Sequence, residues 1–174
     1  MAHRYDLRTM NDDLNLSQYS TSALLRMHGA LLSELRSRGV LRSENNPTGD
    51  YAEYLFSRAF GWTLETNSRS GYDAIDSDGI RYQIKGRRLA QRRSRQLSFI
   101  RNLDLKPFDF LAGVIFDADF SVIRAALVPV DVVKEQSRFV EHVRGWQLFL
   151  KDSIWDVPGV IDVTDDLKRA EKAL

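Results

Sequence analysis

Residues 71–88 read GYDAIDSDGIRYQIKGRR, and they decide how the middle of the chain folds. Apolar and polar side chains alternate along positions 80–84, which is the two-residue period of a half-buried strand. The turn-forming residues 76–79 (DSDG) come directly before this strand, so the stretch is predicted to form a β-hairpin. Gly79 suits the left-handed position of a three-residue hairpin loop that ends in a bulge.

The alternation also predicts the register of the hairpin. With residues 77–79 as the loop, the apolar side chains share one face, and Asp73 lies opposite Gln83 on the other face, which also carries Lys85. A two-residue loop would instead put Asp73 opposite Ile84, because a slip of one residue moves every side chain to the other face. The apolar pattern therefore favours the three-residue loop, with an Asp, a Gln and a Lys converging on one polar face.

These polar residues resemble a known motif. Asp73, followed after nine residues by the tripeptide 83–85 (Gln-Ile-Lys), is similar to the PD-(D/E)xK motif of restriction-endonuclease-like nucleases. The chain departs from that motif at two places. Gly-Tyr at residues 71–72 stands where a loosely kept Pro would precede the Asp, and Gln83 stands where Asp or Glu is usual. Gln in that position occurs in the Mrr-like branch of restriction endonucleases.

The resemblance covers roughly residues 48–130 and includes Glu53, on a predicted helix over residues 49–60, where the superfamily often places an acidic residue. It implies hydrolysis of DNA phosphodiester bonds with Mg²⁺, for which Mn²⁺ would substitute. Lys85 would lie beside the attacking water and the scissile phosphate. The implied metal ligands are Asp73, Gln83, the backbone carbonyl of Ile84 and Glu53; the implied catalytic residues are Glu53, Asp73, Gln83 and Lys85.

The basic residues are concentrated in one segment, although the net charge of the 174-residue chain is only +1. Residues 81–101 contain eight Lys and Arg and no acidic residue. The rest of the chain contains the other 17 basic residues and all 24 Asp and Glu, so its net charge is −7. A basic segment on an otherwise acidic protein is typical of a phosphate-binding surface. The expected DNA contacts are Arg87, Arg88, Arg92, Arg93 and Arg95, with Ser68 and Arg69 from the turn before the hairpin.

Composition excludes several kinds of site. Without cysteine the chain has no disulfide, thiolate zinc site or cysteine nucleophile, and His3, His28 and His142 are too scattered to form a close metal-binding pair. No apolar run approaches the roughly 20 residues needed to span a bilayer. The first 13 residues lack the apolar core of a signal peptide, so no membrane association and a cytoplasmic location are expected.

The order of predicted elements favours an α/β or α+β fold, with helices around one mixed sheet. The same order is found in the core of the nuclease superfamily, so the resemblance implies a restriction-endonuclease-like core. The apolar run 110–116 is expected to be a strand covered on both faces, and the long connection before it allows it to run parallel to its neighbour. Further strands are expected at 62–66, 121–128, 146–150 and 160–163, and further helices at 21–38, from Asp131, as its cap, to about 138, and from Thr164. The connection 87–107 has a weak helical pattern in Leu97, Ile100, Arg101 and Leu103.

We expect one compact domain, made of a nuclease-like part over residues 48–174 and an N-terminal extension over residues 1–47. The amphipathic helix 21–38 lies outside the nuclease-like core in this interpretation, as a brace or a dimerisation element. Thr48 is the expected N-cap of the next helix. A homodimer is expected if the protein cuts both DNA strands at once, because one site handles one strand.

Other interpretations of the same residues stay open. Asp73 would also suit a strand-edge aspartate that makes turn hydrogen bonds, Glu53 a solvent-facing helix residue, and Gln83 with Lys85 an exposed polar face. The basic segment would equally suit a solvated loop or a surface for an acidic protein. The substitution of Gln for an acid favours a further alternative, a catalytically inactive nuclease-like DNA-binding protein.

Overall fold

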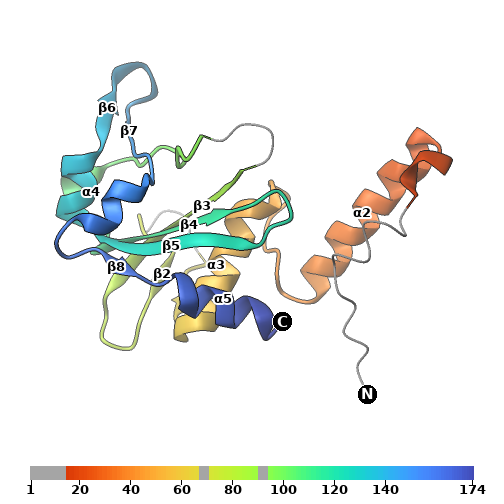
Figure 1. Cartoon of the computed structure of the whole chain (residues 1–174), viewed down its shortest axis with the longest axis horizontal. Coiled ribbons are helices and arrows are strands. Elements are labelled where there is room, and N and C mark those ends of the chain that lie inside the picture. Colours follow the sequence, from red (N-terminus) through yellow and green to blue (C-terminus); the bar gives the residue numbers. More distant parts are fainter. Residues whose placement is uncertain (1–14, 67–70, 90–93) are drawn as a thin grey trace. The chain divides into compact units, whose positions relative to one another are not determined.

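A computed structural model describes residues 15–66, 71–89 and 94–174. The chain divides into two compact units, Met1–Leu41 and Arg42–Leu174, which are described separately (Figure 1). The described part of the first unit contains the 3-10 helix Leu16–Gln18 and helix α2, Thr21–Ser37. The Ser20 hydroxyl accepts a hydrogen bond from the Ala23 N–H at 3.3 Å, and Gly39 follows α2 with a φ of 71°. The predicted helix over residues 21–38 is therefore confirmed to within one residue.

The second unit is built on a six-stranded mixed sheet in the order β1-β2-β3-β4-β5-β8. Among the strands that the structure describes in this sheet, only the central pair, β3 and β4, runs parallel, as expected from the long connection between these two strands. The described residues also form a separate two-stranded hairpin of β6 and β7. The strands are β1 Thr63–Leu64, β2 Ala74–Ile75, β3 Arg81–Arg88, β4 Phe110–Phe116, β5 Val122–Pro129, β6 Arg138–Val140, β7 Gly145–Gln147 and β8 Ile161–Asp162.

Helices cover both faces of this sheet. Figure 1 shows α3, Pro47–Phe60, beside α5, Thr164–Lys172, on one face, and α4, Val130–Gln136, lies on the other. Each face has its own apolar core, and β4 contributes alternate residues to both, so the expectation of a strand buried on two sides is confirmed. Residues of the first core include Ala52, Phe56, Tyr82, Ile84, Val114 and Leu167; residues of the second include Leu97, Ile100, Leu111, Ile115, Val133 and Leu148.

The hairpin has the predicted register. Ala74 pairs with Tyr82, and Gly79 has a φ of 81° at the end of the three-residue loop. The Asp76 N–H donates to the Ile80 carbonyl at 3.1 Å and so closes the loop. Tyr82 and Ile84 are buried under α3, so the burial of their apolar area fixes the register as the alternation indicated.

Three local expectations were wrong. Asn46, not Thr48, is the N-cap of α3, because its side-chain oxygen accepts from the Thr48 N–H at 3.1 Å and Pro47, which lacks an N–H, takes the first helical position. Asp131 lies in the first turn of α4 rather than at its cap, since the helix already begins at Val130.

The third correction concerns the connection between β3 and β4, where the spacing of Leu97, Ile100 and Leu103 suggested a helix. Residues 94–101 are not helical: Gln96 and Ile100 form isolated antiparallel bridges with Phe149 and Trp146, and Ile100 exchanges backbone hydrogen bonds of 2.8 and 2.9 Å with Trp146. Only residues Leu103–Leu105 form a short 3-10 helix. All three apolar side chains are nevertheless buried, because this segment packs as an edge against the 145–150 region.

No helix within residues 15–66, 71–89 and 94–174 is both long and apolar enough to cross a membrane.

A close approach between α3 and β3 sets the position of the helix. A Cβ atom added at Gly86 would lie 2.9 Å from the Thr48 carbonyl oxygen and 3.0 Å from the Ala52 Cβ. Two small residues, Gly86 and Ala52, therefore meet where the helix crosses the strand, and a larger residue at either position would push the helix outward.

We predict that Gly86→Ala destabilises the protein by about 2 kcal/mol, because the added methyl group meets backbone atoms that cannot move aside. The matched control is Gly49→Ala, on the same helix, where an added Cβ meets nothing within 4 Å. That control should be neutral or stabilising by up to about 1 kcal/mol. The free energy of unfolding from urea titration measures both, and equal effects of the two substitutions would contradict the argument.

Candidate functional site

Asp73 lies where β2 separates from β3. The backbone ladder between the two strands ends at the pair Ala74 and Tyr82, and the Asp73 N–H still donates to the Tyr82 carbonyl at 2.8 Å. The next donor on β3, the Ile84 N–H, bonds at 2.7 Å to the Asp73 side-chain oxygen Oδ2. A carboxylate has therefore taken the place of a strand carbonyl, which holds Asp73 at the opening of the hairpin.

Gln83 is the cross-strand neighbour of Asp73, as the predicted register requires. Its side-chain amide nitrogen donates to the same Asp73 oxygen that accepts from the Ile84 N–H. A neutral amide can make this bond directly, whereas an acidic residue in its place would face Asp73 with like charge. Gln83 thus holds the Asp73 side chain on the polar face of the hairpin.

Glu53 comes from α3 and reaches the same place. It lies in the second turn of the helix, beside the close approach at Gly86, and its side chain is 23% exposed. Glu53 and Asp73 together line a cavity of about 300 Å³, as the sequence-based expectation of a shared site requires. The remaining residues that line the cavity are Arg42, Ser43, Asn45, Asp50, Glu65, Thr66 and Tyr72.

Burial and neighbouring charges both act on Glu53. Burial, and after it the negative charge of Asp73, raises the pKa of Glu53 to about 7. The positive charges of Arg42 and Lys85 act in the opposite direction and lower this pKa. Lys85 therefore lies within electrostatic reach of Glu53, while Gln83 contacts Asp73 directly.

Arg42 also belongs to this cluster, although no sequence pattern marks it as a site residue. Its Nη1 contacts the Glu53 Oε2 at 3.1 Å, and its Nη2 donates to the Glu65 carbonyl. The backbone N–H groups of Arg42 and Ser43 donate to one oxygen of Asp50 at 2.8 and 2.7 Å. An isolated arginine in a connection has no periodicity to mark it, so only the folded chain shows that it faces Glu53.

The donor set fits a hard divalent cation. Mg²⁺ takes oxygen ligands, usually one or two carboxylates, and keeps several waters. Asp73 and Glu53 supply two carboxylates, and Gln83 and the Ile84 carbonyl supply neutral oxygens beside them. Across the described parts of the chain, no three His, Asp or Glu side chains are grouped closely enough to make a site of protein ligands alone. Water molecules would have to complete the coordination.

The basic segment divides according to its hydrogen-bond acceptors. Arg87 donates to the Ser94 carbonyl at 3.1 Å, and Arg88 donates to the Ala118 carbonyl while its guanidinium lies 4.3 Å from the centre of the Phe120 ring. Carbonyl groups orient these arginines without neutralising them. Both side chains line a second cavity of about 320 Å³, together with Asn46, Thr48 and Gly86.

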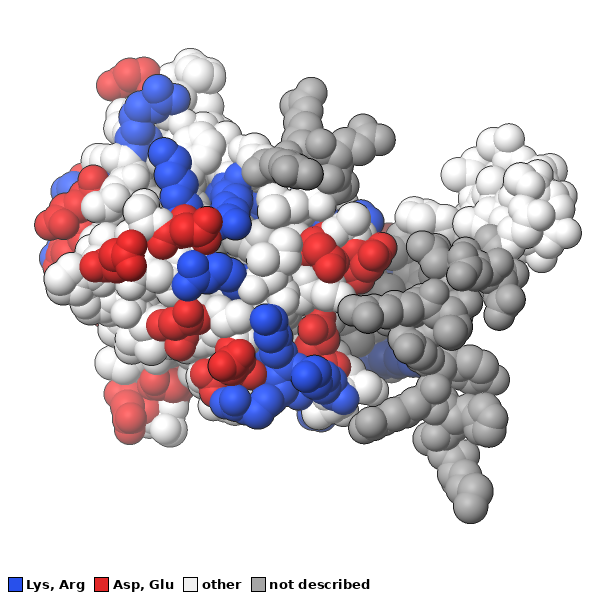
Figure 2. Space-filling model, in the orientation of Figure 1, with Lys and Arg blue, Asp and Glu red and all other residues white. Residues whose placement is uncertain are grey.

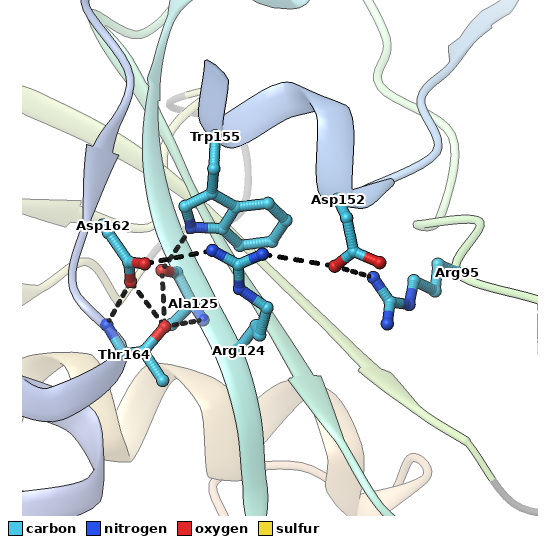
Figure 3. Close-up of polar contacts among 7 residues, drawn as sticks. All are labelled: Arg95, Arg124, Ala125, Asp152, Trp155, Asp162 and Thr164. Atoms are coloured by element: carbon cyan, nitrogen blue, oxygen red, sulfur yellow. Dashed lines mark hydrogen bonds and ion pairs between the residues drawn. The ribbon is translucent and has the colours of Figure 1, made fainter. Parts of the chain in front are cut away.

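Arg95 has acidic partners instead (Figure 3). Its Nη1 lies 2.6 Å from Asp152 Oδ1, and Arg124 bridges Asp152 at 3.2 Å to Asp162 at 3.1 Å. The guanidinium of Arg124 also stacks 3.8 Å from the centre of the Trp155 ring. This network ties the 94–96 segment to β5, β8 and the 3-10 helix Asp152–Asp156, so Arg95 has a structural role whatever else it contacts.

The other expected DNA contacts, Ser68, Arg69, Arg92 and Arg93, lie outside the described residues. On the face of the molecule shown in Figure 2, acidic and basic side chains are interspersed.

No model of a known protein family matches the chain, and no curated protein sequence matches it. The function is therefore inferred from the residues of the site.

The raised pKa of Glu53 predicts how the stability of the protein without added metal depends on pH. An unfolded chain ionises Glu53 near pH 4.5, whereas the folded protein keeps it protonated up to about pH 7. Between these values the unfolded state has lost the proton and the native state has not, so the contribution of Glu53 to stability falls as the pH rises. The loss should total on the order of 3 kcal/mol, since one pKa unit corresponds to about 1.4 kcal/mol.

Urea unfolding of the wild type and of Glu53→Gln at pH values from 4.5 to 7.5 isolates this contribution from that of the other titrating groups. The difference between the two free energies of unfolding should shift in favour of Glu53→Gln as the pH rises. A difference that stays constant, or that shifts in favour of the wild type, would contradict the placement of Glu53 beside Asp73.

Proposed function

We propose that the protein is a metal-dependent endonuclease that hydrolyses phosphodiester bonds in DNA, in a restriction, defence or repair role, and that its sheet is a restriction-endonuclease-like core. The observation that supports this proposal is the convergence of Glu53, Asp73, Gln83 and Lys85 where β2 leaves β3. Two carboxylates, an amide and a lysine at one opening of a sheet suit phosphoryl chemistry.

In this proposal Asp73, Glu53, Gln83 and the Ile84 carbonyl hold Mg²⁺, with Mn²⁺ able to substitute. When bound, the ion would make water more acidic and neutralise charge on the phosphate. Asp73 stays fixed by the Ile84 N–H through one of its oxygens and presents the other oxygen to the cation. Lys85, on the polar face of β3, neutralises the charge that develops on the phosphate as the attacking water bonds to phosphorus.

The first test is cleavage of plasmid, linear, branched and methylated DNA with Mg²⁺ and Mn²⁺. We expect Lys85→Ala to reduce cleavage on the order of a thousandfold and to leave DNA binding largely unchanged, because Lys85 acts mainly in the transition state. Lys172→Ala, which removes the same charge from the exposed end of α5, is the control and should cleave as the wild type does. Unchanged cleavage by Lys85→Ala would remove Lys85 from the site.

Gln83→Glu tests the metal ligands. The substitution replaces an amide that donates to Asp73 by a second carboxylate, so Asp73 and Glu in place of Gln83 repel each other until a cation lies between them. We expect the affinity for Mg²⁺, measured by calorimetry, to rise about tenfold, since ligand charge governs binding of hard cations. Gln136→Glu, at the exposed end of α4, should leave the affinity unchanged. An unchanged affinity in Gln83→Glu would mean that residue 83 does not contact the metal.

Arg87 and Arg88 are the described arginines most suited to hold the DNA backbone in this proposal. Their charge is oriented by neutral carbonyl groups and stays available, and both follow Lys85 on β3. Arg95 differs because Asp152 already neutralises it. We therefore assign the phosphate contacts first to Arg87 and Arg88. DNA contacts by Ser68, Arg69, Arg92 and Arg93 stay predictions from the sequence.

Salt dependence separates these arginines. Replacing both Arg87 and Arg88 by Ala should lower the slope of log affinity against log salt concentration by about two, because each lost phosphate contact lowers it by about one. Arg95→Ala should leave the slope unchanged and reduce thermal stability instead, since it breaks the ion pair with Asp152. Fluorescence anisotropy with labelled DNA measures the slope. An equal loss of slope from Arg95→Ala would contradict this division.

A homodimer would present two sites to the antiparallel strands of a duplex, and the apolar residues of α2 are the proposed surface for it.

The alternative function is a catalytically inactive DNA-binding protein, which the neutral Gln83 favours. Salt-sensitive DNA binding without cleavage by any metal would make that alternative the better account.

A further inference from the structure

Arg42 places a positively charged side chain beside the carboxylate of Glu53. Its guanidinium spans from the Glu53 carboxylate to the Glu65 carbonyl, and both it and Glu53 line the cavity that contains Asp73. The Arg42 side chain is 34% exposed and Glu53 is 23% exposed, so the pair lies at the mouth of the cavity and is partly shielded from water. Coulomb interactions are stronger in such a place than on an open surface.

The segment that carries Arg42 is fixed independently of the ion pair. Asp50, in the first turn of α3, accepts from the backbone N–H groups of Arg42 and Ser43 and from the Ser43 hydroxyl at 3.0 Å. The backbone of residue 42 is thereby attached to the same helix that carries Glu53. The guanidinium can move while its backbone stays in place, because only the side chain takes part in the ion pair.

The ion pair itself has the geometry of an exchangeable contact. One nitrogen of Arg42 meets one oxygen of Glu53 at 3.1 Å. By contrast, the Arg81 guanidinium makes two contacts with Asp109, at 3.1 and 3.0 Å, and the Arg81 backbone N–H adds a third at 2.9 Å. A two-point arginine–carboxylate pair with a backbone bond is built for stability, whereas a one-point pair leaves the other carboxylate oxygen for a second partner.

We propose that Arg42 holds the Glu53 carboxylate in the metal-free protein, in the place of the divalent cation, and that its guanidinium leaves Glu53 when the cation binds. This inference rests on the metal site of the proposed function. The cation and the Arg42 guanidinium compete for the Glu53 carboxylate, so Arg42 weakens metal binding while it keeps the two carboxylates from repelling each other in the metal-free state.

The test is calorimetric titration of the full chain with Mn²⁺ alone, in the absence of DNA. Arg42→Met removes the competing cation and keeps a side chain of similar length, so it should bind Mn²⁺ about tenfold more tightly than the wild type. The control is Arg58→Met, which removes the same charge from an exposed position near the far end of α3 and should leave the affinity unchanged. Arg42→Lys, which loses the second contact to the Glu65 carbonyl, should show an intermediate gain.

A double substitution shows whether Arg42 acts through Glu53. In a Glu53→Gln background the ion pair is already absent, so adding Arg42→Met should change the Mn²⁺ affinity by less than about twofold. Arg42→Lys retains a charged residue at the position and keeps the test available if Arg42→Met does not fold. Wild-type binding of Mn²⁺ with an equal or weaker affinity in both Arg42 variants would overturn the inference and leave the metal site standing. Absence of Mn²⁺ binding in every protein, wild type included, would overturn both.

Discussion

The hydrogen bond from the Ile84 N–H to the Asp73 carboxylate is the interaction on which the arrangement of the site depends. It ends the ladder between β2 and β3 without leaving the β3 donor unpaired, which would be costly in a half-buried strand. A side chain can replace a strand carbonyl in this way only where the two strands diverge. The same bond therefore opens the sheet and holds a carboxylate at the opening.

The second constraint is the close contact between α3 and β3. Gly86 and Ala52 allow the helix backbone to approach the strand, and Glu53 follows Ala52 directly. The helix is held by the apolar core beneath it, so Glu53 is brought near Asp73 even though two carboxylates repel each other. Core packing thus offsets the cost of burying Glu53 near Asp73, and burial, followed by the negative charge of Asp73, raises the pKa of Glu53. Arg42 relieves part of that repulsion.

The basic residues show how partners alter the meaning of a charge pattern. Arg87, Arg88 and Arg95 look alike in sequence, yet carbonyl groups hold the first two and Asp152 neutralises the third. Asp152 lies 57 residues from Arg95 along the chain, and Asp162, on β8, extends the same network. The hydrogen-bond acceptor of each arginine must therefore be known before a run of arginines can predict which of them are available to bind phosphate.

The sequence by itself determined the hairpin, its register and the mixed sheet, because these follow from local alternation, turn chemistry and the length of one connection. The two-residue period of positions 80–84 and the loop glycine leave one register that buries Tyr82 and Ile84. The sequence also pointed to Glu53, Asp73, Gln83 and Lys85 through their resemblance to a nuclease motif. Only the tertiary structure decided that residues 94–101 are not helical, since backbone hydrogen bonds of Leu97 to Leu148 and of Ile100 to Trp146 select cross-strand pairing over a helix. Only the tertiary structure brought Arg42 to Glu53 and separated Arg95 from Arg87. Contacts between residues distant along the chain depend on packing, which no local pattern encodes.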